Sequence, residues 1–371
     1  MNSPEPGGLV RTADGLDDAL AILQDADWWA VDTEFQREST YFAVPCLIQV
    51  GDGRHAFAFD ALSLDLSPLW PLLLDPARLK LMHSADQDHE IFVQEAGDAP
   101  APLFDTQVAA TLLGIGDQIG YAGLVEARLG LTVDKSLSRT DWTRRPLSDA
   151  AVTYALDDVV HLAAIYPALR DELETAGRLD WLQQDCAELC HAERYRPDPS
   201  TAWKRLKGLG RLAPADQQVA ARLAHWREEL AVSSNRPRRW ILKDEVVLAV
   251  AQRRPADDRG LEPLGVGKPG SRVRRSLAEL IADGLYDDLP NQALASGERP
   301  DPEQKQRQSA LAARCRQRGE ELNIPPSYLA RRADRAALLE HGDNAELRVL
   351  RGWRRELVGE DLLALRERLL G

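Results

Sequence analysis

The sequence has few cysteines, few methionines and no long apolar run. Among its 371 residues are four cysteines and two methionines. So few cysteines in a chain of this length cannot form a disulfide framework, and Cys186 and Cys190 lack a second pair at metal-ligand spacing, so we predict buried thiols and no zinc site. The longest apolar run, 246–251, is too short for a membrane span, and the N-terminus lacks the basic start and apolar stretch of a secretory signal. These absences predict a soluble, cytoplasmic protein with no membrane association.

Charge is divided unevenly along the chain. Residues 1–195 carry 13 Lys and Arg against 33 Asp and Glu, whereas residues 196–371 carry 33 against 26, and the formal net charge is −13. An acidic front and a basic back indicate parts with different partners, and a basic surface attracts nucleic acid. Apolar residues make up 44% of the chain, which is enough for sizeable cores and excludes a disordered protein.

The pattern of the first half predicts a mixed sheet covered by helices, an α/β architecture. Apolar runs predict strands at 28–31, 41–50, 54–60, 79–82 and 103–104. Helical spacing predicts helices at 16–26, 86–96, 106–114 and 148–165. Asp105 and Ser148 are placed to cap the last two helices, and Pro45 predicts an edge or a bulge in the middle strand of the hairpin.

The second half predicts helices only. No segment after Arg170 has the pattern of a strand, and proline-containing linkers occur at 197–199 and 289–302. We therefore predict three domains, at 1–195, 200–286 and 303–371, of which the last two are all helical.

Acidic residues gather in three separate segments. Asp32 and Glu34 end an apolar strand and, being two apart, lie on one face of it. Asp88 lies in the first turn of a predicted helix, and Tyr154 and Asp158 are four apart on another helix, so they share its face. Each pattern alone is also typical of a strand end, a helix cap or an amphipathic helix, and only their combination is specific.

The combination resembles the DEDD exonucleases of the ribonuclease H-like fold, and within them ribonuclease D of the tyrosine subgroup. The first motif of that family matches Asp32 and Glu34, the second matches Asp88, and the third matches Tyr154 and Asp158. The histidine subgroup would carry histidine at position 153, which is threonine here. The segments 104–107 and 133–148 also look like ribonuclease D rather than a DNA proofreading domain.

The resemblance continues into the second half. Residues 201–285 are similar to the HRDC module shared by ribonuclease D and RecQ-type helicases, most clearly over 236–245, where the sequence reads RPRRWILKDE. Residues 303–371 occupy the position of a second, more divergent HRDC-like module. The fold implied is thus a ribonuclease H-like exonuclease domain followed by two HRDC-type helical modules.

The resemblance implies a metal-dependent 3′→5′ exoribonuclease that releases 5′-mononucleotides from RNA with a free 3′ end, mainly precursor tRNA and other small structured RNAs. It implies two divalent cations, Mg²⁺ or Mn²⁺, with Asp32 bridging both. Glu34 and Asp158 would hold the cation on the nucleophile side, and Asp88 would help to hold the other. Tyr154 would orient the attacking water, because a free phenol is a poor base at neutral pH. No dedicated protein partner is implied.

Basic residues offer candidate contacts for nucleic acid. They are Lys135 and Arg139 near the acidic segments, and Lys204, Arg205, Arg238 and Arg239 in the first helical module. Trp203 and Trp240 adjoin these cations and could stack on bases, but we predict that both belong to the core. We also expect His83 and His89 to be packing or hydrogen-bonding residues rather than metal ligands.

Two other functions remain compatible with the sequence. One is a DNA 3′→5′ exonuclease of the same fold, since the chemistry at phosphorus is identical. The other is a non-catalytic nucleic-acid-binding protein that has kept the fold. The presence of all four acids and Tyr154 argues against the second.

Overall fold

The computed structural model describes residues 7–137, 140–268, 270–294 and 301–371. The chain forms two compact units. The first consists of Met1–Gln36, Pro45–Tyr195 and Pro300–Gly371, and the second of Arg37–Val44 and Arg196–Arg299. Within the described ranges, every helix is too short or too polar to cross a lipid bilayer.

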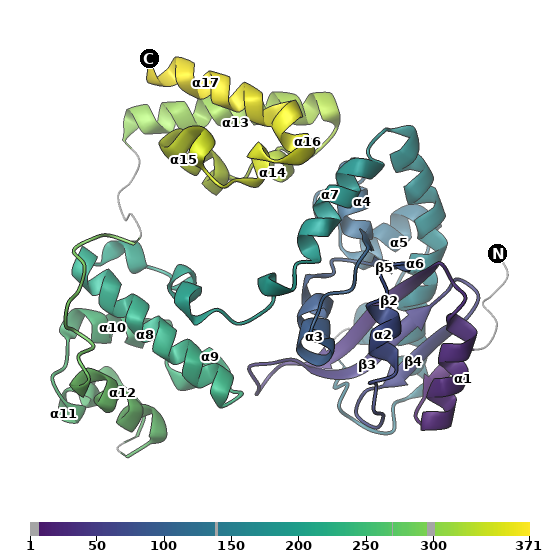
Figure 1. Ribbon diagram of the computed structural model, residues 1–371, viewed down its shortest axis with the longest axis horizontal. Helices are drawn as coiled ribbons and strands as arrows, with labels where there is room; N and C mark the ends of the chain where they lie inside the picture. The colour runs from purple at the N-terminus through teal and green to yellow at the C-terminus, as the bar shows by residue number, and fades with distance from the viewer. Residues whose placement is uncertain (1–6, 138–139, 269, 295–300) are drawn as a thin grey trace. The chain divides into compact units, whose positions relative to one another are not determined.

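A six-stranded sheet with the order β1-β4-β3-β2-β5-β6 forms the centre of the first unit (Figure 1). The strands are β1 (Gly8–Val10), β2 (Trp28–Gln36), β3 (Val44–Gly51), β4 (Ala56–Asp60), β5 (Leu79–Met82) and β6 (Leu103–Asp105). Strands β3 and β4 form the predicted antiparallel hairpin, whereas the pairs β1–β4, β2–β5 and β5–β6 are parallel. The predicted mixed sheet is therefore present.

The sheet differs from the prediction in several details. Strand β2 runs to Gln36 and β3 begins at Val44, whereas the apolar runs predicted strands at 28–31 and 41–50. Strand β3 lies between β4 and β2, so the edge position predicted from Pro45 is wrong. Pro45 is the second residue of β3, near the strand start, where a missing N–H is tolerated. Strand β1 was not predicted, because three residues after a Pro- and Gly-rich start show no periodic pattern.

Seven helices of the first unit follow or connect these strands. They are α1 (Ala13–Leu23), α2 (Leu69–Leu73), α3 (Asp86–Ala96), α4 (Thr106–Leu112), α5 (Tyr121–Leu129), α6 (Asp149–Thr175) and α7 (Leu179–Leu189). The predicted caps are present: the Asp105 carboxylate accepts from the amides of Gln107 and Val108, and the Ser148 hydroxyl accepts from that of Ala151. These bonds satisfy amides that the helix itself leaves unpaired.

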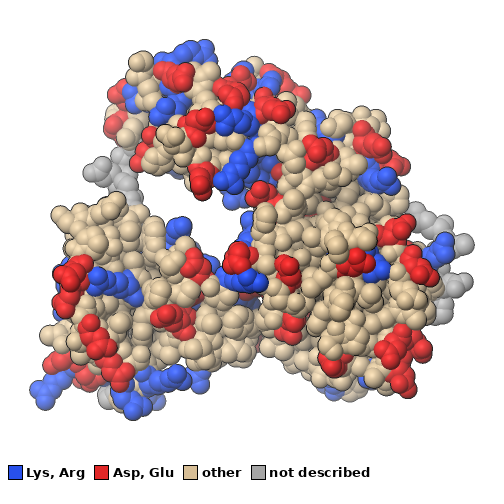
Figure 2. All heavy atoms as spheres, in the orientation of Figure 1, with Lys and Arg blue, Asp and Glu red and all other residues tan. Residues whose placement is uncertain are grey.

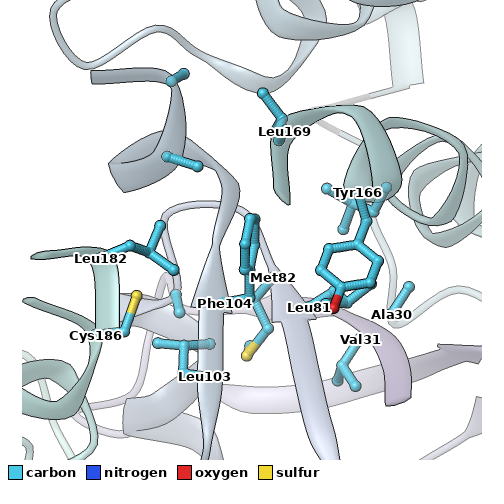
Figure 3. Close-up of a cluster of buried hydrophobic side chains, with 14 of the residues drawn as sticks. Ala30, Val31, Leu81, Met82, Leu103, Phe104, Tyr166, Leu169, Leu182 and Cys186 are labelled. Atoms are coloured by element: carbon cyan, nitrogen blue, oxygen red, sulfur yellow. The ribbon is translucent and has the colours of Figure 1, made fainter. Parts of the chain in front are cut away.

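The main core holds α6 and α7 against the sheet. Figure 3 shows Phe104 of β6 and Leu81 of β5 among the side chains of Tyr166 on α6 and Leu182 on α7. The rings of Phe104 and Tyr166 meet edge to face with centroids 5.0 Å apart. Trp28 of β2 contacts the same Tyr166 ring, with centroids 5.5 Å apart. The long helix α6 is thereby fixed against β2, the strand that carries Asp32 and Glu34.

The C-terminal helices pack on α7 and belong to the first unit. They are α13 (Pro302–Leu322), α14 (Pro326–Leu329), α15 (Arg332–His341), α16 (Gly352–Arg354) and α17 (Glu360–Leu370). Trp353 stacks on Trp181 of α7 with ring centroids 4.7 Å apart and planes 9° from parallel. The buried carboxylate of Asp185 on α7 pairs with the buried guanidinium of Arg354 and accepts a 2.6 Å hydrogen bond from the Tyr328 hydroxyl. The contacts at this junction are thus both apolar and ionic.

The second unit is helical, and no strand follows β6 in the described ranges. Its helices are α8 (Pro214–Ser233), α9 (Arg238–Ile241), α10 (Asp244–Arg253), α11 (Asp258–Leu261) and α12 (Arg272–Ala282). The segment Arg37–Val44, which joins β2 to β3 along the chain, packs in this unit. The Tyr41 hydroxyl donates to the Glu228 carboxylate at 2.5 Å, and Asn235 Oδ1 accepts from the amides of Tyr41 and Phe42. The sequence pattern did not predict this segment's place.

Candidate active site

Three of the four predicted acids meet in one cluster. Ligand oxygens of Asp32, Glu34 and Asp158 lie within 4.8 Å of one another. Strand β2 continues beyond Val31, so both of its acids project from one face of a regular strand. Helix α6 contributes Asp158, which is only 6% exposed. Segments more than 120 residues apart therefore form one cluster of acids.

The fourth acid, Asp88, lies beside this cluster. It is buried in the first turn of α3, and its Oδ1 accepts a 2.5 Å hydrogen bond from the hydroxyl of Thr33, between the two acids of β2. Its charge raises the pKa values of Asp32 and Glu34. The structure thus brings all four predicted acids to one site and gives Asp88 an anchor on β2.

Burial makes this set of carboxylates difficult to ionise. It raises the pKa of Glu34 to about 9 and those of Asp88 and Asp158 to about 7. The pKa of Asp32 is raised well above its usual value by burial and then by the charge of Asp158. Two like charges about 5 Å apart repel by about 3 kcal/mol at an effective dielectric constant of about 20. A divalent cation would offset this repulsion, and a site of carboxylate oxygens suits Mg²⁺ or Mn²⁺.

Tyr154 lies on the same face of α6 as Asp158. Burial and then the charges of Asp158, Glu34 and Asp32 raise its pKa above the ordinary value, so the phenol is protonated at neutral pH. Its ring lies against that of Trp142, with centroids 6.1 Å apart. A protonated phenol next to carboxylates can orient a water molecule by hydrogen bonding but is a poor proton acceptor.

An ion pair fastens the segment that carries Trp142. The Arg145 guanidinium donates to both oxygens of Asp60, at 2.7 and 2.8 Å, and to the backbone carbonyl of Cys46 at 3.0 Å. Asp60 ends β4 and is 1% exposed. This anchor holds Trp142 in a small core with Leu47, against which Tyr154 packs.

Tyr121 is a site residue that the sequence did not reveal. Its hydroxyl lies 3.1 Å from the backbone carbonyls of Asp157 and Asp158 and 3.1 Å from His161 Nδ1. A hydrogen bond with Tyr121 also lowers the pKa of Asp158, against the larger effect of burial. Tyr121 begins α5 and has no regular spacing to the acids, so no motif could indicate it.

His83 and His89, which lie near the acids in sequence, contact other groups of the protein. His83 Nδ1 is 2.9 Å from the Thr106 hydroxyl, and His89 Nδ1 is 2.9 Å from the Leu189 carbonyl. Neither belongs to the group of acids within 4.8 Å. These contacts agree with the expected packing and hydrogen-bonding roles.

The predicted nucleic-acid contacts have different surroundings. Arg139 and the side chain of Lys135 lie outside the described residues. Arg205 and Arg238 both pair with the buried carboxylate of Glu228, so part of their charge is compensated internally. Lys204 lies near the ring of Trp203, and Arg239 is exposed.

The two tryptophans of this module differ in exposure. Trp203 is partly buried against the core of the second unit. Trp240 is 63% exposed, so the prediction that it belongs to the core is wrong. The apolar pattern around it is satisfied instead by Ile241 and Leu242, which are both buried. On the face drawn in Figure 2, positive and negative side chains are interspersed, so the basic balance of the second half is not a uniform positive surface there.

Comparison with known proteins places the chain in a family. A family model described as 3′-5′ exonuclease matches residues 9–174, and one described as HRDC domain matches residues 216–282. Ribonuclease D of Granulibacter bethesdensis is 39% identical over 369 residues, which covers 96% of this chain and 92% of the relative. The chain belongs to the ribonuclease D family. Ribonuclease D of Gluconacetobacter diazotrophicus is 38% identical and covers 98% of the chain.

A solved member of the ribonuclease D family has the same fold over nearly the whole chain. The crystal structure of Escherichia coli RNase D, described as an exoribonuclease involved in structured RNA processing, matches with a TM-score of 0.86 and 30% identity. The match covers 98% of this chain and 99% of the other. The predicted fold class is therefore confirmed, and the chain is a metal-dependent 3′→5′ exoribonuclease that acts on nucleic acid.

Proposed function

We propose that this member of the ribonuclease D family trims the 3′ ends of precursor tRNA and other small structured RNAs in the cytoplasm, using two divalent cations. The observation that carries the proposal is the convergence of Asp32, Glu34 and Asp158 within 4.8 Å, with Asp88 beside them. We further propose the division into domains 1–195, 200–286 and 303–371. The exonuclease and HRDC matches at 9–174 and 216–282 support the first two.

The acids fit a pair of cations by charge and by ligand type. Four ionised carboxylates carry a charge of −4, which two divalent ions would balance. Asp32, Glu34, Asp158 and Asp88 would supply the carboxylate oxygens that hold the cations, with Glu34 and Asp158 on the side of the attacking water. Cations held by these carboxylates would supply the positive charge that favours activation of a water and departure of the 3′ oxygen in an in-line displacement.

The protein's own groups would align the reactants. The protonated phenol of Tyr154 would hold the attacking water by a hydrogen bond, and the contact with Trp142 would keep the phenol in place. The Thr33 hydroxyl would keep the Asp88 carboxylate turned toward β2. Attack by water on the terminal phosphodiester would release a 5′-mononucleotide and leave a new 3′ hydroxyl.

A structured RNA with a short single-stranded 3′ end suits this arrangement. The acidic first half disfavours RNA except where cations compensate, whereas the second half carries a positive balance and an HRDC match. The Escherichia coli relative, at 30% identity, is described as acting in structured RNA processing. Precursor tRNA combines a folded body with a 3′ extension, so we propose it as the main substrate.

The proposal is tested with purified protein and a tRNA that carries a 3′ extension. Shortening by single nucleotides should occur with Mg²⁺ or Mn²⁺ and stop with excess chelator, and a DNA of matched sequence should be degraded more slowly. Asp158→Asn should abolish turnover, whereas Asp157→Asn, an exposed acid on the same helix, should change it little. Equal activity of wild type and Asp158→Asn would refute the assignment of the acids.

A further inference from the structure

Trp240 is unusual because a large aromatic side chain faces solvent. It is 63% exposed, the highest value among the exposed large apolar residues of the described chain. Tryptophan is usually buried over most of its surface, and the tryptophans that a protein exposes are enriched where it contacts other molecules. Among the described residues, no aromatic ring stacks on that of Trp240. Trp203, the other tryptophan near these cations, is partly buried in the core of the second unit.

The backbone on both sides of Trp240 is held firmly. Arg238 pairs with Glu228, whose side chain is 1% exposed. The Arg238 guanidinium also lies 4.7 Å from the centre of the Tyr41 ring. On the other side Ile241 and Leu242 are buried, and the Leu242 carbonyl accepts a 2.9 Å hydrogen bond from Arg227. The fold therefore uses the neighbours of Trp240 as anchors and presents its ring in a preorganised position.

Three exposed cations lie within four residues of Trp240 in the sequence. Arg236, Arg239 and Lys243 are all exposed, and in the described ranges none of them forms an ion pair. They differ in this respect from Arg238 and Arg227, which pair with Glu228 and Asp244. An aromatic face beside unpaired cations matches the two parts of a single strand of nucleic acid, its bases and its phosphates.

We propose that Trp240 stacks on an unpaired base of the RNA substrate while Arg239, Lys243 and Arg236 contact neighbouring phosphates. The inference rests on the proposed function for the identity of the ligand and adds to it a binding site outside the cluster of acids. Unpaired bases are required, because the bases of a duplex already stack on one another. Every base has a π face, so the site accepts any sequence.

Binding without cleavage is the direct test. Fluorescence anisotropy of the full chain in chelator measures affinity for an unstructured 12-nucleotide RNA and for a blunt RNA duplex of the same length. Trp240→Ala should weaken single-strand binding about 5- to 150-fold, in keeping with about 1–3 kcal/mol for a stacked base. Duplex binding should change little. Trp240→Phe should keep most of the affinity, and Ile22→Ala, a substitution at an exposed apolar side chain of α1, should have no effect.

The salt dependence separates stacking from phosphate contact. Trp240→Ala should leave the slope of log Kd against log salt unchanged, whereas Arg239→Ala and Lys243→Ala should each reduce it by about one. Unchanged single-strand affinity of Trp240→Ala, equal loss in the Phe and Ala variants, or an altered slope for Trp240→Ala would each overturn the inference. A change only in self-association would overturn it too.

The test also distinguishes this inference from the proposed function. If the Trp240 variants behave as expected but the wild-type chain does not shorten 3′-extended tRNA, the stacking site stands and the proposed substrate is wrong. If tRNA is shortened normally and Trp240→Ala binds single strands like the wild type, the stacking site is wrong and the proposed function stands.

Discussion

Tyr121 shows how a single hydroxyl can support a site whose acids come from other segments. One phenol oxygen contacts two carbonyls of α6 and the ring of His161, within one helical turn of Asp158. A hydroxyl has one proton, so the two carbonyls and His161 Nδ1 cannot each receive a full hydrogen bond from it. Tyr121 thereby joins the start of α5 to the part of α6 that presents Asp158.

Removing the Tyr121 hydroxyl should leave the Asp158 carboxylate less firmly positioned. Tyr121→Phe keeps the ring but loses the three contacts of the hydroxyl. Mutation of a group that orients a metal ligand typically lowers metal affinity or activity by about 10- to 100-fold. We expect weaker Mn²⁺ binding by calorimetry and a lower kcat with a nearly unchanged KM for RNA. Tyr286→Phe, which removes a hydroxyl bonded to a carbonyl in the second unit, should alter neither. Equal Mn²⁺ affinity of wild type and Tyr121→Phe would contradict this role.

The raised pKa values of the acids predict how stability depends on pH. The folded, metal-free protein keeps protons on Glu34, with a pKa of about 9, and on Asp88 and Asp158, with pKa values of about 7, whereas the unfolded chain loses them near pH 4. The folded state binds more protons, so its stability falls as the pH rises from about 4 to 9.

Calorimetry with and without metal tests this dependence. The Tm of the metal-free protein should fall between pH 5 and pH 9, and the rise in Tm on adding Mn²⁺ should be larger at pH 8 than at pH 6, because the cation binds the ionised form. Asp32→Asn should flatten the metal-free curve. A metal-free Tm that rises over this range would show that the acids ionise freely without a cation.

At the scale of elements, sequence features that act over a few residues predicted helices and strands correctly, whereas features that depend on distant segments did not. The bounds of β5 and α3 agree with the prediction, as do the caps of α4 and α6, because apolar spacing and capping side chains act within a few residues. The edge position, one of the two alternatives predicted from Pro45, was wrong because strand order depends on pairing between distant segments. The exposure of Trp240 was missed because composition does not distinguish an inward ring from an outward one.

The same distinction applies to the acids. That Asp32 and Glu34 share a strand face, and Tyr154 and Asp158 a helix face, follows from periodicity. The two pairs come together because α6 packs across β2 through the contact of Trp28 with Tyr166. The sequence indicated this meeting only through the family resemblance. The bond between Thr33 and Asp88 and the contacts of Tyr121 have no local signal at all.

At the scale of the whole molecule, the chain order does not follow the packing. The last helices belong to the first unit, and the residues between β2 and β3 belong to the second. Gly114 indicates how close the C-terminal helices approach, because its φ of +70° is left-handed and a Cβ there would lie 2.2 Å from the Asn323 side chain. Arg178 spans the same junction by donating to the carbonyls of Leu112 and Leu322.

The buried carboxylate of Asp185 should control whether the C-terminal helices stay docked on α7. It accepts from Arg354, Tyr328 and Trp353, and Arg354 is 2% exposed. Asp185→Asn leaves this guanidinium buried without a counter-charge, which typically costs about 3–5 kcal/mol. We expect faster hydrogen exchange across α13–α17 and a lower Tm, with kcat on a short single-stranded RNA within about two-fold of wild type. Glu188→Gln, at an exposed acid of the same helix, is the matched control, and equal exchange in the two variants would mean that stacking of Trp181 on Trp353 holds the junction without the ion pair.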